Sequence, residues 1–321
     1  MNQRENALEM ITWGKPEFVP NTFDAYHIVL LATGITDQPW RGGVDPFGVN
    51  WVATPEGAIP EPNKFMFDDI ADWKEYVKFP DVDKFDFTQV ANIELGHADR
   101  NEKIICMFNA CGLFERLVAF MGFENALCAL VEDPDACKEF FDAFSDYKVA
   151  TIGKAIDVYK PDIVMYYDDI ATARGLFMSP QTYREVIKPY HRKISEYVVS
   201  RGCIFEQHTC GKCEEVLEDF VEIGAKIWNP AQVCNNIPEI QKKFKGRLIV
   251  NGGWDSQGSC ALPGADAEAL KNEARRCMND YGKNGGFMIY PLIVNENGLA
   301  YVVGDERLPA LTEEWYNINK L

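Results

Sequence analysis

The sequence predicts one α/β domain over residues 1–321, folded as a (β/α)8 TIM barrel with an N-terminal helix and long loops over the barrel mouth. Two observations predict this fold. Short apolar runs, about eight in all, alternate with amphipathic segments along most of the chain, as in a parallel sheet with helical crossovers. The sequence has neither a Gly-x-Gly-x-x-Gly motif after a strand nor a Gly-Lys-Ser/Thr phosphate loop, which disfavours an open nucleotide-binding sheet.

The first part of the chain is expected to contain a helix, a strand and a long ordered loop. Residues 2–14 carry apolar residues at helical spacing, and Gly14 and Pro16 end the pattern. Residues 18–23 are apolar enough for a first strand. Residues 33–63 are dense in Gly, Pro and aromatic residues. Because long structureless loops are uncommon in compact domains, we expect this segment to be an ordered loop that contains a strand and covers a cavity.

The rest of the chain alternates expected helices and strands. Asp133 and Pro134 supply an N-cap and a first-turn proline for one long helix that reaches residue 156. The other expected helices cover residues 68–77, 112–122, 179–200, 214–224, 238–244 and 265–281. The other expected strands cover residues 103–109, 162–170, 203–208, 225–232, 247–255 and 286–290.

Composition limits the partners and the compartment. With 32 basic and 49 acidic residues the formal net charge is -17, so nucleic acid and anionic membrane surfaces are not expected as partners. No run approaches the ~20 apolar residues of a membrane span, and residues 1–6 lack the basic-then-apolar form of a secretion signal. These features predict a cytoplasmic protein whose ten cysteines are reduced thiols.

The stretch from residue 202 to 224 carries the strongest chemical signal. His208 and Cys210 fall between an expected strand and an expected helix. Because strand side chains alternate, Glu206, His208 and Cys210 are expected to project to the same side. Imidazole, thiolate and carboxylate are the groups that bind zinc. The alternative is an ordinary buried cysteine beside a histidine, since His-x-Cys alone has little specificity.

Further polar residues are expected at the carboxyl ends of strands, where barrels carry their chemistry. Asp168 and Asp169 are adjacent, so alternation points one of them inward, and one is expected to bind substrate or to act as an acid or base. Glu206 and Tyr290 complete the candidate catalytic set. The alternative for each residue is a helix cap or a loop hydrogen bond. Others at strand ends are Asn109, Cys111, Glu115, Asn229, Gln232, Asn251, Trp254 and Asp255.

Several motifs occur in order along the chain: Asp168-Asp-Ile, Ser179-Pro, Lys188-Pro-Tyr, His208-Thr-Cys-Gly, Gly252-Gly-Trp-Asp and Gly285-Gly-Phe. Together they resemble the uroporphyrinogen decarboxylase superfamily. The His-x-Cys-Gly motif is similar to its branch of zinc-dependent, corrinoid-linked methyltransferases. The decarboxylases of the superfamily hold a polycarboxylate substrate with an arginine-rich N-terminal motif. No arginine lies between Arg4 and Arg41 here, so porphyrinogen decarboxylation is not expected.

The resemblance implies a zinc ion held by His208, Cys210 and a third ligand, a methyl-corrinoid such as methylcobalamin as co-substrate on a partner corrinoid protein, and a homodimer. That branch places a further thiolate on the last strand, where this chain has Tyr290-Pro-Leu-Ile-Val. The third ligand is therefore expected to be Glu206, Cys213 or Cys234. We favour Cys234, because adjacent strand ends meet at a barrel mouth.

The function predicted from the resemblance is transfer of a methyl group between a corrinoid and a small thiol or methylated compound, in either direction. One alternative is a metal-independent decarboxylase or lyase that acts on a small carboxylic acid through Asp168 or Asp169 and Tyr290. Another is a ligand-binding barrel without turnover. Metal dependence distinguishes the methyltransferase from the decarboxylase or lyase. Product formation distinguishes both enzymes from the ligand-binding barrel.

Overall fold

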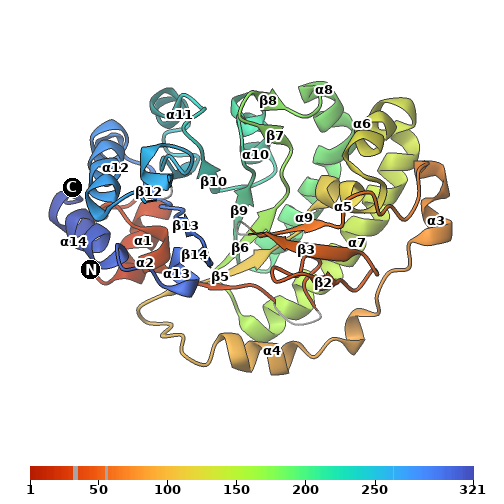
Figure 1. Ribbon diagram of the computed structural model, residues 1–321, viewed down its shortest axis with the longest axis horizontal. Helices are drawn as coiled ribbons and strands as arrows, with labels where there is room; N and C mark the ends of the chain where they lie inside the picture. Colours follow the sequence, from red (N-terminus) through yellow and green to blue (C-terminus); the bar gives the residue numbers. More distant parts are fainter. Residues whose placement is uncertain (32–34, 55–56, 263) are drawn as a thin grey trace.

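The computed structural model describes residues 1–31, 35–54, 57–262 and 264–321, and its centre is a curled parallel sheet (Figure 1). Seven strands lie side by side in the order β1 (Tyr26–Val29), β5 (Ile104–Asn109), β6 (Ile163–Tyr167), β9 (Ile204–His208), β10 (Ile227–Ala231), β11 (Ile249–Gly252) and β12 (Phe287–Ile289). Every neighbouring pair is parallel. The arrangement confirms the predicted TIM-barrel-like α/β fold.

A bridge joins the edge strand β12 to the segment that precedes β1. The Asn21 side chain accepts a hydrogen bond from the Phe23 N–H at 3.1 Å, which begins the short helix α2 (Thr22–Ala25) inside the segment expected as the first strand. That segment pairs with β12 only between Asn21 and Ile289, and β1 starts after the helix. In the described part of the chain, seven strands and one bridge therefore stand where eight strands were expected.

Helices surround the sheet in Figure 1. They are α1 (Gln3–Ile11), α3 (Trp73–Tyr76), α4 (Phe87–Glu94), α5 (Leu113–Met121), α6 (Phe123–Glu132), α7 (Pro134–Tyr159), α8 (Pro180–Thr182), α9 (Lys188–Ser200), α10 (Leu217–Glu222), α11 (Ile237–Lys243), α12 (Ala267–Asp280), α13 (Ala300–Val303) and α14 (Leu308–Ile318). The predicted cap of α7 is confirmed, since Asp133 accepts from the Ala136 N–H at 3.0 Å and Pro134 opens the helix. None of the described helices has the length and apolar character that a bilayer crossing requires.

The strands divide their side chains between two apolar clusters. One set fills the inside of the curled sheet and includes Cys106, Phe108, Met165 and Met288. Residues at alternate positions, such as Met107 and Val164, belong to the larger core that also contains residues of the surrounding helices. This alternation follows from strand geometry and places the side chains of Glu206 and His208 on the same side of β9.

The long segment before residue 64 forms a small antiparallel sheet over one end of the barrel. Its strands are β2 (Gly43–Val44), β3 (Asn50–Thr54) and β4 (Gly57–Pro60). The Trp40 ring lies 5.5 Å from Phe108, an inward-facing residue of β5, which confirms the prediction that a long loop covers the barrel mouth. Within the expected loop 33–63, residues 33–34 and 55–56 lie outside the described residues.

Two buried ion pairs attach this small sheet to the barrel helices. Arg116 of α5 contacts Asp45 at 2.6 Å, and Lys148 of α7 contacts Asp37 at 2.6 Å. Arg116 and Asp45 are both fully buried. Since a buried charge is costly without a partner, these pairs fix the position of the sheet over the barrel. They were not predicted from the sequence.

Candidate functional site

The site is built around His208, the last residue of β9. Its side chain is 7% exposed, and its Nδ1 lies 2.7 Å from Oδ1 of Asn229 on the neighbouring strand β10. An amide oxygen accepts hydrogen bonds, so Nδ1 carries the proton and the lone pair is on Nε2. Nε2 lies 3.8 Å from the sulfur of Cys210. His208 thus presents a free nitrogen to a thiol at the carboxyl end of the sheet.

Asp169 joins this pair from the end of β6. Its Oδ1 accepts a hydrogen bond of 2.6 Å from the Cys210 backbone N–H, and its Oδ2 accepts one of 3.2 Å from the Tyr167 hydroxyl. One possible ligand atom each of Asp169, His208 and Cys210 lies within 4.8 Å of the others. Of the two adjacent carboxylates in the sequence, Asp169 is therefore the one that lies beside His208 and Cys210.

Burial determines the ionisation of the three groups. It lowers the pKa of His208 to about 3, so the imidazole is neutral at physiological pH. Burial also raises the pKa of Asp169 to about 6, and burial followed by the charge of Asp169 raises the pKa of the Cys210 thiol well above its ordinary value. A bound cation favours the ionised form of both acids, so this donor set fits a divalent metal ion such as zinc.

Asp168, a candidate catalytic residue, faces the opposite side of the sheet. Its carboxylate accepts hydrogen bonds from the N–H groups of Phe114 and Glu115, at 3.1 and 3.0 Å, at the start of α5. It also lies 2.7 Å from Nε2 of His191 and is fully buried. This carboxylate therefore holds the first turn of α5 and a histidine of α9, and the structure does not bring it together with Cys210.

Glu206 and Tyr290 lie elsewhere in the barrel interior. Glu206 is fully buried, and its carboxylate accepts from Asn251 Nδ2 at 3.0 Å and from the Tyr26 hydroxyl at 3.3 Å. Burial raises the pKa of Glu206 to about 7. Tyr290 is 8% exposed, and its ring lies 4.9 Å from that of Phe23. The structure places neither residue in the group formed by Asp169, His208 and Cys210.

The two cysteines considered as a third ligand, of which Cys234 was favoured, lie outside this group of ligand atoms. Cys234 follows β10, and its sulfur lies 3.5 Å from Nδ2 of Asn235. Cys213 is buried, with its sulfur 3.4 Å from the backbone oxygen of Cys210. Within the described residues the group of possible ligand atoms contains Asp169 in place of either cysteine. The preference for Cys234 rested on the meeting of adjacent strand ends at the mouth, whereas among the described residues its sulfur is not part of the group formed by Asp169, His208 and Cys210.

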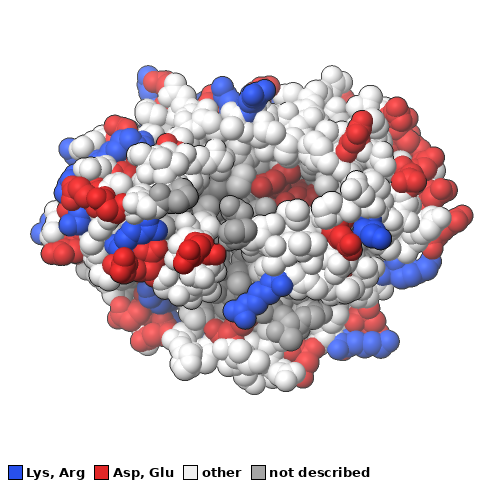
Figure 2. All heavy atoms as spheres, in the orientation of Figure 1, with Lys and Arg blue, Asp and Glu red and all other residues white. Residues whose placement is uncertain are grey.

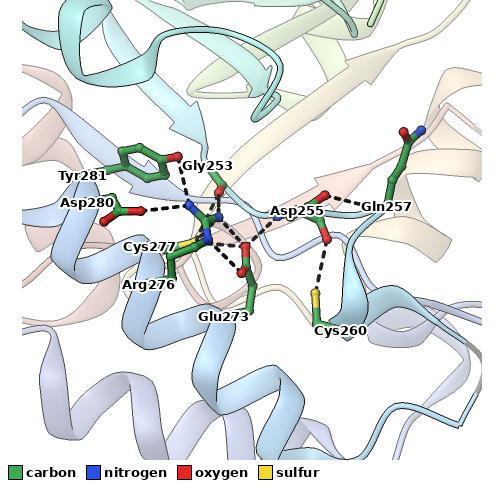
Figure 3. A network of polar contacts seen from close by, with 9 residues as sticks. All are labelled: Gly253, Asp255, Gln257, Cys260, Glu273, Arg276, Cys277, Asp280 and Tyr281. Atoms are coloured by element: carbon green, nitrogen blue, oxygen red, sulfur yellow. Dashed lines mark hydrogen bonds and ion pairs between the residues drawn. The ribbon is translucent and has the colours of Figure 1, made fainter.

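The carboxyl end of β11 is held by a separate polar network (Figure 3). Arg276 of α12 donates to the backbone oxygen of Gly253 at 2.6 Å, and Glu273 accepts from the Asp255 N–H at 2.8 Å. The sulfur of Cys277 lies 3.3 Å from the same Gly253 oxygen. These contacts hold the Gly252-Gly-Trp-Asp255 segment against α12. Asp255, which the sequence places at the end of a strand, therefore helps to anchor this loop.

Sequence reasoning missed an aromatic wall beside His208. The ring of Tyr167 lies 4.5 Å from His208 and 5.4 Å from Phe108, which in turn contacts Trp40. Tyr167 and Phe108 occupy inward positions near the ends of their strands. The alternation of side chains along these strands was the sequence signal that could have identified both residues. Trp40 lies on the preceding loop, and no periodicity in the sequence places it there.

The chain is similar to a known protein family, to a curated protein and to a solved structure. The family model of uroporphyrinogen decarboxylase (URO-D) matches residues 45–292. A methylated-thiol--coenzyme M methyltransferase of Methanosarcina mazei is 26% identical over 161 residues, which are 49% of this chain and 40% of that relative's length. A solved structure of a methyltransferase from Methanosarcina mazei superposes with a TM-score of 0.70 at 14% identity and covers 99% of both chains.

The family match spans more than half of the chain and includes β5 to β12, with Asp169, His208 and Cys210 at the mouth. The solved structure supports the same fold along the whole length. The chain belongs to the uroporphyrinogen decarboxylase (URO-D) family.

Proposed function

We propose that the protein is a zinc-dependent methyltransferase that moves a methyl group between a corrinoid and a small thiol or methylated compound. The observation that carries the proposal is the convergence of His208 Nε2, the Cys210 sulfur and the Asp169 carboxylate within 4.8 Å. The similarity to a methylated-thiol--coenzyme M methyltransferase supports the type of reaction. A corrinoid-carrying protein as methyl donor or acceptor is part of the proposal.

His208, Cys210 and Asp169 would hold the zinc ion. Three protein ligands leave one position for a substrate, which is typical of catalytic zinc. Zinc bound there supplies a Lewis acid that lowers the pKa of a thiol ligand. Asn229 keeps the lone pair of His208 on Nε2, and the Cys210 N–H holds the Asp169 carboxylate in place. The chain therefore preorganises the donors through hydrogen bonds from two neighbouring strands and a loop.

The proposed reaction is a nucleophilic substitution at the methyl carbon. The substrate thiol releases its proton to solvent, and its sulfur forms a bond to the methyl carbon. The bond between that carbon and the corrinoid cobalt breaks, and its electron pair stays on the corrinoid. Run in reverse, the same steps remove the methyl group from a methylated thiol. The contact between Trp40 and Phe108 at the mouth would limit the access of water to the substrate thiolate.

Metal content tests the ligand set. Purified without chelator, the protein should contain about one zinc per chain by elemental analysis. His208→Ala, Cys210→Ala and Asp169→Ala should each lose it, and Cys234→Ala, the matched control, should retain it. Loss of zinc in Cys234→Ala with retention in Asp169→Ala would restore the ligand set expected from the sequence. A zinc-free parent protein would remove the mechanism.

Methyl transfer is tested with methylcobalamin and a panel of small thiols, followed through the corrinoid absorption spectrum. Thiol-dependent demethylation that disappears in Cys210→Ala is the expected result. Turnover of a small carboxylic acid by metal-free protein would instead support the decarboxylase or lyase. Ligand-dependent thermal stabilisation without product would support the binding barrel.

A further inference from the structure

We propose that Gln232 and Asn235, on the loop after β10, are positioning residues that hold the sulfur of Cys210 toward the metal in the proposed zinc site. Among the described residues, neither side chain belongs to the group of possible metal ligands, so both act through the backbone that carries Cys210. The inference rests on the proposed function, because it concerns one of the three proposed zinc ligands.

The segment that carries Cys210, residues 209–213, is a loop between β9 and the helical turn that precedes α10. Gly211 lies at its centre with a φ of +87°, and a Cβ atom there would lie 2.7 Å from the backbone carbonyl carbon of Ala171. The backbone conformation and this close approach therefore both favour glycine. Because the loop lies outside the described helices and strands, its backbone groups need partners from neighbouring segments.

The side chains of Asn235 and Gln232 provide such partners. Nδ2 of Asn235 donates to the backbone oxygen of Gly211 at 2.9 Å, and its Oδ1 accepts from the backbone N–H of Cys213 at 2.9 Å. Oε1 of Gln232 accepts from the N–H of Gly211 at 2.8 Å. The two side chains thus bind three backbone groups in the residues that directly follow Cys210.

Asn235 is itself held firmly in the loop after β10. It is 6% exposed, and its backbone N–H and Nδ2 both donate to the backbone oxygen of Gln232, at 3.1 and 2.9 Å. Both polar atoms of its amide are therefore paired. Because a buried amide that loses its partners is costly, this arrangement fixes the distance between the two loops.

The hairpin of β7 (Ala171–Thr172) and β8 (Gly175–Leu176) also holds the loop. The N–H of Lys212 donates to the backbone oxygen of Thr172 at 2.7 Å. Figure 2 shows a hollow with acidic side chains inside it, near the centre of the face it draws, between the β2–β4 sheet and this hairpin. The loop is thus bonded to two other segments of the chain, and both restrict the movement of Cys210.

Zinc affinity tests the positioning role. Asn235→Ala removes two contacts and should lower the affinity roughly tenfold, measured by competition with a chromophoric chelator. Gln232→Ala removes one contact of a partly exposed side chain and should lower it less. Gln232→Glu keeps the acceptor oxygen and should retain the affinity. Asn236→Ala is the matched control, because Asn236 is exposed and its side chain makes no cap hydrogen bond, and it should bind zinc like the wild type.

Cobalt substitution distinguishes positioning from a merely structural role. The thiolate-to-cobalt charge-transfer band reports the bond between the Cys210 sulfur and the metal. This band should weaken in Asn235→Ala and remain in Asn236→Ala and Gln232→Glu. Should Asn235→Ala not fold, Gln232→Ala carries the same test. A variant that loses stability in urea but keeps both the zinc affinity and the cobalt band would overturn the positioning role.

Hydrogen exchange of metal-free protein separates this inference from the proposed zinc chemistry. The N–H groups of Gly211 and Cys213 should exchange slowly in the wild type, and that of Cys213 should exchange faster in Asn235→Ala. Rapid exchange of both groups in the wild type would overturn the positioning role even if zinc binds. Slow exchange in a wild-type protein that binds neither zinc nor cobalt would overturn the positioning role together with the zinc site.

Discussion

Two neighbouring residues of α5 face two kinds of buried acidic cluster. Arg116 points beneath the β2–β4 sheet, where Asp45 accepts from its guanidinium, from the Trp51 indole N–H and from two backbone N–H groups. Burial, followed by the charges of Asp169 and Asp168, raises the pKa of Glu115 well above its ordinary value. Direct pairing of Arg116 with Asp45 in the first cluster indicates a structural role, although Nε of Arg116 has no hydrogen-bond partner among the described residues. The second cluster brings three acidic side chains together and includes Asp169, a proposed zinc ligand.

The first prediction breaks the paired cluster and has the largest expected effect. Arg116→Met keeps much of the side-chain volume but leaves Asp45 buried without its cation. The free energy of unfolding should fall by about 3–5 kcal/mol, measured by urea denaturation. The double variant Arg116→Met, Asp45→Asn should recover part of the loss. An Arg116→Met protein as stable as wild type would mean that the ion pair does not hold the small sheet.

The second prediction concerns the charge of Asp169 at the mouth. Removing this charge is expected to stabilise the metal-free protein, whereas removing the charge of Arg116 is expected to destabilise it. The pKa of Asp169 in the folded protein is about 6, above its ordinary 3.8, so the folded state binds more protons across that interval. Its contribution to the stability of metal-free protein is therefore greatest below pH 3.8 and is lost as pH rises through 6. At pH 8, Asp169→Asn should raise the stability of chelator-treated protein, by at most about 3 kcal/mol. Lower stability of the variant at pH 8 would mean that the carboxylate is compensated in the folded protein.

The third prediction concerns the orientation of His208. Asn229→Ala removes the acceptor on Nδ1, so the imidazole loses its fixed tautomer, and zinc affinity should fall about 10–100-fold. Competition with a chromophoric chelator measures it. Asn229→Asp retains an acceptor at the same position and should keep the affinity. If Asn229→Ala binds zinc as tightly as wild type, the amide does not orient the ligand.

The contrast between the two clusters also explains what the sequence predicted. Strand alternation was sufficient to place His208 inward and to separate Asp168 from Asp169. The pairing of Arg116 with Asp45 joins residues 71 positions apart through a small sheet whose register no local pattern encodes. Cys234 was preferred because strand ends converge, but its direction depends on the loop after β10. Periodicity thus predicts which face a residue takes within an element, and it does not predict contacts made through loops.

The last and smallest prediction tests a paired carboxylate at the edge of the protein. Asp162 accepts two hydrogen bonds from Arg4 of α1, at 2.6 and 2.7 Å, and one from the Ile105 N–H at 2.9 Å. Burial acts to raise the pKa of Asp162, but the bonds from Arg4 and Ile105 outweigh it, and the pKa lies below the ordinary 3.8.

The folded state therefore binds fewer protons than the unfolded one, and the stabilisation by Asp162 is present above pH 3.8 and is lost as pH falls through its folded value. Asp162→Asn should cost about 1 kcal/mol at pH 7, because the pair is partly exposed, and the cost should shrink in acid. Measured over the same pH range by urea denaturation, Asp162→Asn and Asp169→Asn should change stability in opposite directions at neutral pH. A cost of Asp162→Asn that does not depend on pH would show that the hydrogen-bond geometry, and not the charge of the carboxylate, holds α1 to the barrel.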